Sequence, residues 1–105
     1  MMKLTNFESG ELLIEDGEGQ SARLTRDQAN RLIMMARMHT VAEFIEKLAS
    51  LISHEGLVQK ISHSFEGRES TERWNIKEKF ARLGTLAKDY QALHPEKIAE
   101  VIQWE

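Results

Sequence analysis

The sequence predicts a mainly α fold, a small bundle of three to four helices with an N-terminal β-hairpin packed on it. Two observations lead to this prediction. Apolar residues between Met34 and Ile52 are spaced alternately by four and three positions, which places them on one face of a helix. Before residue 25, short apolar segments flank an Asp-Gly turn, which is typical of a hairpin.

The length of the chain indicates one domain. A chain of 105 residues can bury one hydrophobic core but not two independent ones. With 41% hydrophobic and 30% charged residues, the composition is that of a folded protein. We therefore expect a single domain over 1–105, divided into a hairpin region over 1–24 and a helical region over 25–105.

The hairpin is predicted from two short strands. Glu11–Glu15 and Gln20–Leu24 lie on either side of the turn at Asp16 and Gly17. Lys3–Phe7 could supply a third strand. The apolar side of such a hairpin must be covered, so we expect it to pack on the helices.

The first helix is predicted to begin after Thr25, where Thr25 and Gln28 form a capping box. A second capping box, from Thr40 to Glu43, allows either one long helix or two helices with a bend. We favour one helix, because the spacing of apolar residues continues through Thr40 without a change of phase.

Glycine and histidine indicate where this long helix ends. Gly56 fits a left-handed C-cap and His54 fits the last turn, so a short helix over 57–65 would follow. Another long helix is predicted after a cap at Ser70 or Thr71. Gly84 would lie inside this helix but off its apolar face. That face would be formed by Ile76, Phe80, Leu83, Ala87 and Tyr90.

The last segment is predicted as a helix that begins at Pro95. Proline is favoured at the first helical position, where its missing N–H is not needed. Three residues would then face the core, namely Ile98, Val101 and Ile102.

Composition limits the classes of function. The chain has no cysteine, which removes thiolate chemistry and suits a reducing compartment. The apolar run Leu32–Ala36 is far shorter than the roughly 20 residues of a membrane-spanning helix. We therefore expect a cytoplasmic protein without membrane spans. The net charge of −3 argues against a general nucleic-acid binder.

No catalytic, cofactor or metal signature is found. His54-Glu55 begins like a zinc-protease motif, but Val58 occupies the position of the second histidine. His63 and Glu55 could join His54 around a metal only if the chain folds back at Gly56. We therefore predict no enzyme activity, no metal site and no cofactor.

Two further patterns also fail as chemical motifs. Ser62 and His63 are adjacent on a helix, so their side chains point apart and do not form a hydrolase pair. Gly17 and Gly19 resemble a phosphate loop, but Glu18 and the acidic residues beside them would repel phosphate. We interpret this segment as a turn.

Nucleic-acid binding is an alternative function for the helix around Arg73–Arg82. Basic side chains near an aromatic one can contact phosphates and stack on a base. Acidic residues are interleaved with them, which is more typical of an ordinary solvated helix. The residues concerned are Arg68, Arg73, Trp74, Lys77 and Lys79.

Protein binding is the function that the sequence favours. The helix over Met34–Ile52 is long enough to form a homodimer as well as an internal core. Tryptophans without an obvious place in the core are candidates for partner contacts. We expect a non-enzymatic accessory protein, a regulator or inhibitor that binds another protein and self-associates, with contacts from Met34, Met38, Trp74 and Trp104.

Overall fold

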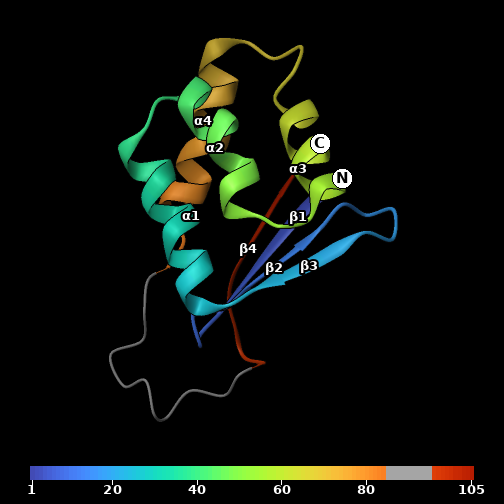
Figure 1. Cartoon of the computed structure of the whole chain (residues 1–105), viewed down its shortest axis with the longest axis vertical. Helices are drawn as coiled ribbons and strands as arrows, with labels where there is room; N and C mark the ends of the chain where they lie inside the picture. The colour runs from blue at the N-terminus through green and yellow to red at the C-terminus, as the bar shows by residue number, and fades with distance from the viewer. Residues whose placement is uncertain (85–95) are drawn as a thin grey trace.

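The computed structural model describes residues 1–84 and 96–105, which form a layer of helices against a four-stranded sheet (Figure 1). The strand order is β3-β2-β1-β4, and every neighbouring pair is antiparallel. The elements are β1 (Met2–Phe7), β2 (Leu12–Glu15), β3 (Ser21–Leu24), α1 (Arg26–Met38), α2 (Val41–Leu51), α3 (Glu55–Ser64), α4 (Ser70–Arg82) and β4 (Ile98–Trp104).

The prediction of a helical bundle with only an N-terminal hairpin was wrong, because the C-terminal segment is a strand. β4 pairs with β1, so Met2 lies opposite Trp104 and the two termini lie close together (Figure 1). The expected last helix had Ile98 and Val101 facing the core, but these side chains are 55% and 42% exposed. Pairing with β1 joins opposite ends of the chain, and the local spacing of apolar residues does not reveal it.

The three predicted N-terminal strands are confirmed, including the one over Lys3–Phe7. Their second turn is held by the Asp16 carboxylate, which accepts the backbone N–H groups of Glu18 at 2.7 Å and Gln20 at 3.0 Å. Gly17 has φ +79°, which glycine adopts without steric cost. These hydrogen bonds, with that from Glu18 the strongest influence, lower the pKa of Asp16.

The prediction of one long helix over Met34–Ile52 was also wrong. α1 ends at Met38 and α2 begins at Val41, with extended backbone at His39 and Thr40 between them. The Thr40 hydroxyl accepts the Glu43 backbone N–H at 3.2 Å, as the second capping box predicted. Local capping therefore decided the boundary.

Two glycines have roles other than those predicted. Gly56 is not a C-cap, because it lies inside the first turn of α3, where His54 Nδ1 accepts the Leu57 N–H at 3.2 Å. α4 ends before Gly84, whose φ is +85° and whose N–H donates to Asn6 Oδ1 at 3.0 Å. Three residues of the predicted helices lie outside the described residues, namely Ala87, Tyr90 and Pro95.

The core is organised around a chain of aromatic rings. Phe44 of α2 contacts Phe65 and Phe80 edge to face, with ring centroids 6.5 and 5.1 Å away. Phe80 in turn contacts Trp104 of β4 at 5.3 Å. Aliphatic residues from β1, β2, α1 and α3 complete the same core, so one hydrophobic centre joins both layers.

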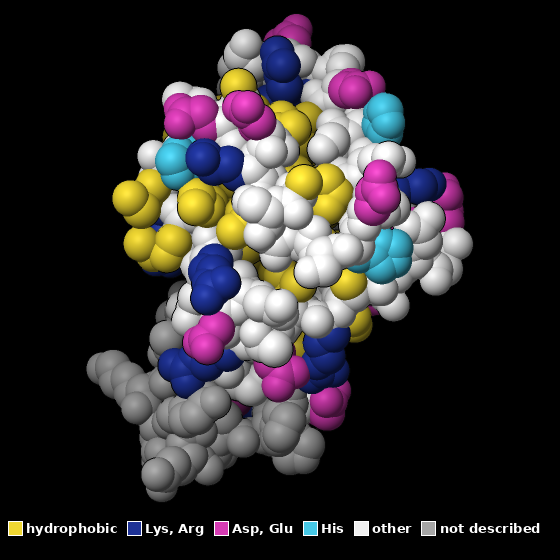
Figure 2. Space-filling model, viewed as in Figure 1, with side chains coloured by type: hydrophobic (Ala, Val, Ile, Leu, Met, Phe, Trp, Pro, Cys, Tyr) yellow, Lys and Arg dark blue, Asp and Glu magenta, His cyan; other side chains and the backbone are white. Residues whose placement is uncertain are grey.

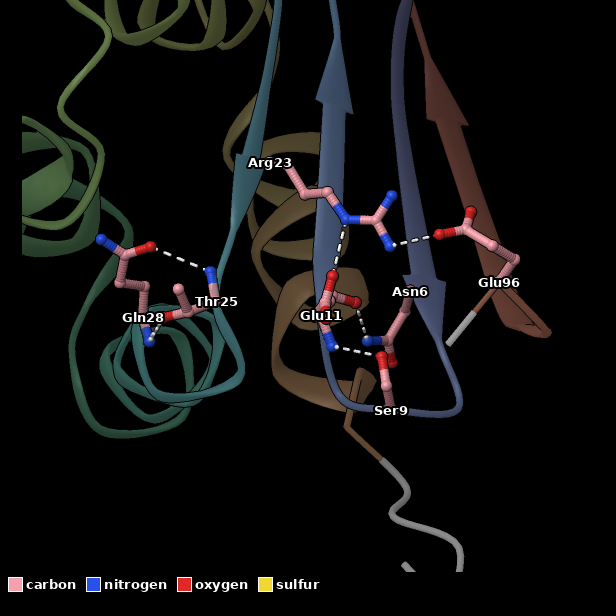
Figure 3. Close-up of polar contacts among 7 residues, drawn as sticks. All are labelled: Asn6, Ser9, Glu11, Arg23, Thr25, Gln28 and Glu96. Atoms are coloured by element: carbon pink, nitrogen blue, oxygen red, sulfur yellow. Dashed lines mark hydrogen bonds and ion pairs between the residues drawn. The ribbon is translucent and has the colours of Figure 1, made fainter. Parts of the chain in front are cut away.

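One arginine side chain extends along the face of the sheet that looks away from the helices (Figure 3). Arg23 of β3 donates from Nε to Glu11 at 2.6 Å and from Nη2 to Glu96 at 3.1 Å. Its guanidinium lies 4.4 Å from the centroid of the Phe7 ring. Arg23 therefore links the edge strand β3 to the segment that leads into β4.

Candidate functional site

Two methionines of α1 form an exposed apolar surface on one helix. Met34 is 47% exposed and Met38 is 71% exposed, and residues four apart share one face of a helix. We call these two residues the methionine patch. Figure 2 shows hydrophobic side chains gathered over the C-terminal end of α1. A hollow of about 260 Å³ adjoins it, lined by Asn30, Ile33, Met34, Arg37 and Gly84.

The methionine patch lies on the outward side of α1. α1 buries a different face, made of Ala29, Leu32, Ile33 and Ala36. The single stripe expected from Met34 to Ile52 is therefore divided. Its second half, Leu48 and Ile52, is buried in the chain's own core.

The two tryptophans have different environments. Trp74 of α4 is 49% exposed, which suits a partner contact. Trp104 is only 7% exposed, and its Nε1 donates to Ser64 Oγ at 2.7 Å. Trp104 therefore belongs to the core and is not available for contact with a partner.

The side chain of Lys77 is buried and hydrogen-bonded within the protein. It is 5% exposed, and its Nζ donates to the Ala36 carbonyl at 2.9 Å, near the C-terminal end of α1. The reciprocal contact runs from α1 to α4: Arg37 Nε donates to the Ala81 carbonyl at 2.7 Å, near the end of α4. Each helix thus supplies a cation to the carbonyl end of the other, where the helix dipole favours positive charge.

The other basic residues predicted to contact nucleic acid differ in how far they are available to a ligand. Arg68 donates to the Ser64 carbonyl at 2.7 Å and lies 3.5 Å from Glu72. Arg73 is partly buried, whereas Lys79 is exposed. These residues all lie on or next to α4, but of the five only Lys79 and Trp74 are exposed.

The histidines considered for a metal site are separated. His54 is the N-cap of α3, and His63 lies in its last turn, so nine residues of helix put them about 13 Å apart along the axis. His63 is within 3.1 Å of Glu66, and both are exposed. In the described ranges, 1–84 and 96–105, no three His, Asp or Glu side chains gather closely enough to hold a metal ion.

A larger hollow, which sequence reasoning missed, lies between the starts of α2 and α4. Its volume is about 430 Å³, and it is lined by Val41, Ala42, Ile45, Ser70 and Arg73. We call it the α2–α4 cleft. One wall is aliphatic, and the other carries a hydroxyl and a guanidinium.

Comparison with known protein families, curated proteins and solved structures finds no match. None of the helices that the structure describes is long and apolar enough to cross a membrane.

One signal in the sequence could have revealed the α2–α4 cleft. If the Thr40 capping box starts a new helix, the apolar residues after it regroup around Phe44 and Leu48. Val41 and Ile45 then lie beside the core face and remain partly exposed, as observed. The position of Arg73 against them depends on how α4 packs, which sequence spacing does not show.

Proposed function

We propose that this chain is a non-enzymatic accessory protein that binds another protein through the methionine patch. The observation that supports this most is the exposure of Met34 and Met38, 47% and 71%, one turn apart on an ordered helix. Methionine is unbranched and polarizable, so neighbouring methionines can adapt to an apolar partner surface. Covering them would remove apolar surface from water.

Trp74 is a second contact residue, because it is half exposed and aromatic. Self-association is restricted to the methionine patch, since Leu48 and Ile52 are already buried within one chain. A regulatory or inhibitory role and a cytoplasmic location remain part of the same proposal, with the cysteine-free sequence in favour of the latter.

Nucleic-acid binding has less support than protein binding. Phosphate contacts require free cations, and Lys77 and Arg68 donate to backbone carbonyls of their own chain. Trp74 and Lys79 alone would give a small contact.

The test uses the tagged chain to capture binding proteins from a native cell lysate. It compares the proteins captured by the wild-type chain with those captured by a Met34→Gln/Met38→Gln variant. Both residues are exposed, so the double substitution should change stability little. We expect a protein that co-purifies stoichiometrically after nuclease treatment and is reduced at least about tenfold with the variant, a loss of about 1.4 kcal/mol in binding. Quantitative mass spectrometry measures the capture.

Lys79→Gln is the matched control, because Lys79 is exposed on α4 outside the methionine patch. Sedimentation equilibrium of the same proteins measures self-association. Equal capture by the wild type and the double variant would contradict the proposed surface. Capture that disappears with nuclease would favour the nucleic-acid alternative.

A further inference from the structure

The α2–α4 cleft combines two kinds of surface in one hollow of about 430 Å³. Val41, Ala42 and Ile45 make its aliphatic wall, and Ser70 and Arg73 make its polar wall. Cavities of this size are typical of sites for small ligands or for one or two residues of a peptide. The polar wall decides which ligand is favoured.

The side chain of Arg73 makes no hydrogen bond or ion pair within the described part of the chain, and its Nε is buried. A guanidinium that is partly withdrawn from water without a counter-charge is costly. Arg68 and Lys77, by contrast, have carbonyl partners. The Arg73 guanidinium therefore has no acceptor among the described residues, and it lies beside the aliphatic wall of the cleft.

Two of the carboxylates near the cleft have partners of their own. Glu72, the residue before Arg73, lies 3.5 Å from Arg68. Glu43, the residue after Ala42, accepts from Thr40 at 2.9 Å and lies 3.0 Å from His39. Glu69, one turn before Arg73 on α4, makes no ion pair with the Arg73 guanidinium, so the described structure leaves this cation open to an external anion.

We propose that the α2–α4 cleft binds an aliphatic carboxylate, presented by the C-terminal residue of a partner polypeptide. A terminal leucine-like residue carries its carboxylate and its aliphatic side chain within a few bonds of each other. The carboxylate would accept hydrogen bonds from Arg73 and Ser70, and the side chain would lie on Val41 and Ile45. This inference rests on the proposed protein-binding function and names the group that the partner contributes.

The first experiment titrates the full chain, labelled with ¹⁵N and with ¹³C in its methyl groups, with N-acetyl-L-leucine and with N-acetyl-L-leucinamide. The two probes differ only in the terminal group, which is a carboxylate in the first and a neutral amide in the second. We expect saturable shifts at Val41, Ala42 and Ile45, and a dissociation constant at least about tenfold lower for the carboxylate, which corresponds to about 1.4 kcal/mol. Equal affinities, or shifts confined to other residues, would overturn the proposal.

A second arm identifies the source of the carboxylate. The tetrapeptide Ala-Ala-Ala-Leu is compared with its C-terminally amidated form in the same titration. We expect the free-ended peptide to bind at least as tightly as N-acetyl-L-leucine. Binding of the small acid without binding of the peptide would show that the cleft takes free acids, and would overturn the assignment to a polypeptide terminus.

Variants assign the effect to the cleft. Arg73→Gln should abolish the preference for the carboxylate, whereas Lys79→Gln, which removes a charge from the same helix, should keep it. Ala42→Phe should fill the hollow and block both probes. Retention of the preference in Arg73→Gln would overturn the proposal, and the comparison of probes on the wild type stands even if that variant does not fold.

The two proposals fail separately. If the cleft is not a carboxylate site, the wild type shows no preference between the probes while capture still depends on Met34 and Met38. If the methionine patch is not a contact surface, capture is unaffected by its substitution while the titration can still succeed.

Discussion

At the scale of single residues, Lys77 is a basic side chain whose environment is set by the packing of two helices. Lys77 is 5% exposed, and its ammonium group reaches the Ala36 carbonyl near the end of α1. The sequence places it among several basic residues of one helix and gives no sign that it differs from Lys79. Its environment comes from the packing of α4 on α1. There Lys77 donates to a backbone carbonyl of α1, and Arg37 of α1 donates to a backbone carbonyl of α4.

We expect Lys77→Met to lower the free energy of unfolding by about 1–2 kcal/mol, since methionine keeps much of the apolar stem but loses a charge-assisted hydrogen bond. Release of the buried charge offsets part of the loss. Urea denaturation followed by circular dichroism measures the change. Lys79→Met is the control and should stay within about 0.5 kcal/mol of the wild type. Equal effects of the two substitutions would contradict the assigned role.

Asp16 gives a pH-dependent prediction. The Glu18 amide, followed by the Gln20 amide and the charge of Lys60, lowers its pKa from the ordinary 3.8. A lowered pKa in the folded state means that the unfolded state binds protons more readily. The stabilisation is therefore present above pH 3.8 and is lost as the pH falls through the folded-state pKa.

We expect Asp16→Asn to be less stable than the wild type at pH 7 and the difference to shrink steadily below pH 4, because the charged hydrogen bonds are then lost in the wild type too. Urea unfolding of both proteins from about pH 7 to pH 2 measures this difference. Stability curves that remain parallel over that range would exclude the proposed linkage.

At the scale of elements, capping explains the boundary that periodicity missed. The apolar spacing continues through His39 and Thr40, yet the chain breaks there and α2 begins with Thr40 as its N-cap. A capping hydroxyl satisfies a backbone donor locally, and Phe44 gains a fully buried position when α2 turns toward the core. Together these favour two helices over one.

We expect Thr40→Ala to destabilise the protein by about 1 kcal/mol, since the Glu43 N–H loses its acceptor. Thr40→Ser is the matched control, because it keeps the hydroxyl and should lose less than half of that amount. Hydrogen exchange of the amides in the first turn of α2 reports where the loss occurs. Unchanged exchange at Glu43 would argue against the cap as the cause.

At the scale of the whole molecule, β4 and the helices close the structure together. Trp104 brings its ring against Phe80 of α4 and its N–H to Ser64 of α3. Arg23 connects β3 with Glu96 on the opposite face of the sheet. The C-terminal strand is thus held from both sides.

We expect a coupling of about 1 kcal/mol between Trp104 and Ser64 in a double-mutant cycle. Trp104→Phe keeps an aromatic ring against Phe80 and removes the donor, whereas Ser64→Ala leaves the indole N–H without its acceptor. The sum of the losses of unfolding free energy in the two single variants should exceed the loss in the double variant by this coupling. Additive losses would show that the hydrogen bond contributes little to the folded state.

Much of the local structure was predictable from sequence alone. The three N-terminal strands, the capping box at Thr25 and the N-cap at Thr40 depend on hydrogen bonds and spacing within a few residues. The prediction that Ser70 or Thr71 caps α4 was wrong, because the N-cap is Glu69 and its side chain makes no capping hydrogen bond. The exposed Met34 was recognised as a candidate contact, but within a stripe that the structure divides.

Tertiary structure alone decided the rest. The pairing of β4 with β1, the burial of Lys77 and Trp104 and the meeting of Arg73 with the start of α2 all join segments far apart in the chain. Such contacts form because strand edges and apolar faces must be covered after the local elements exist. Sequence by itself determined where most elements begin, and packing determined which side chains became core, cap or accessible surface.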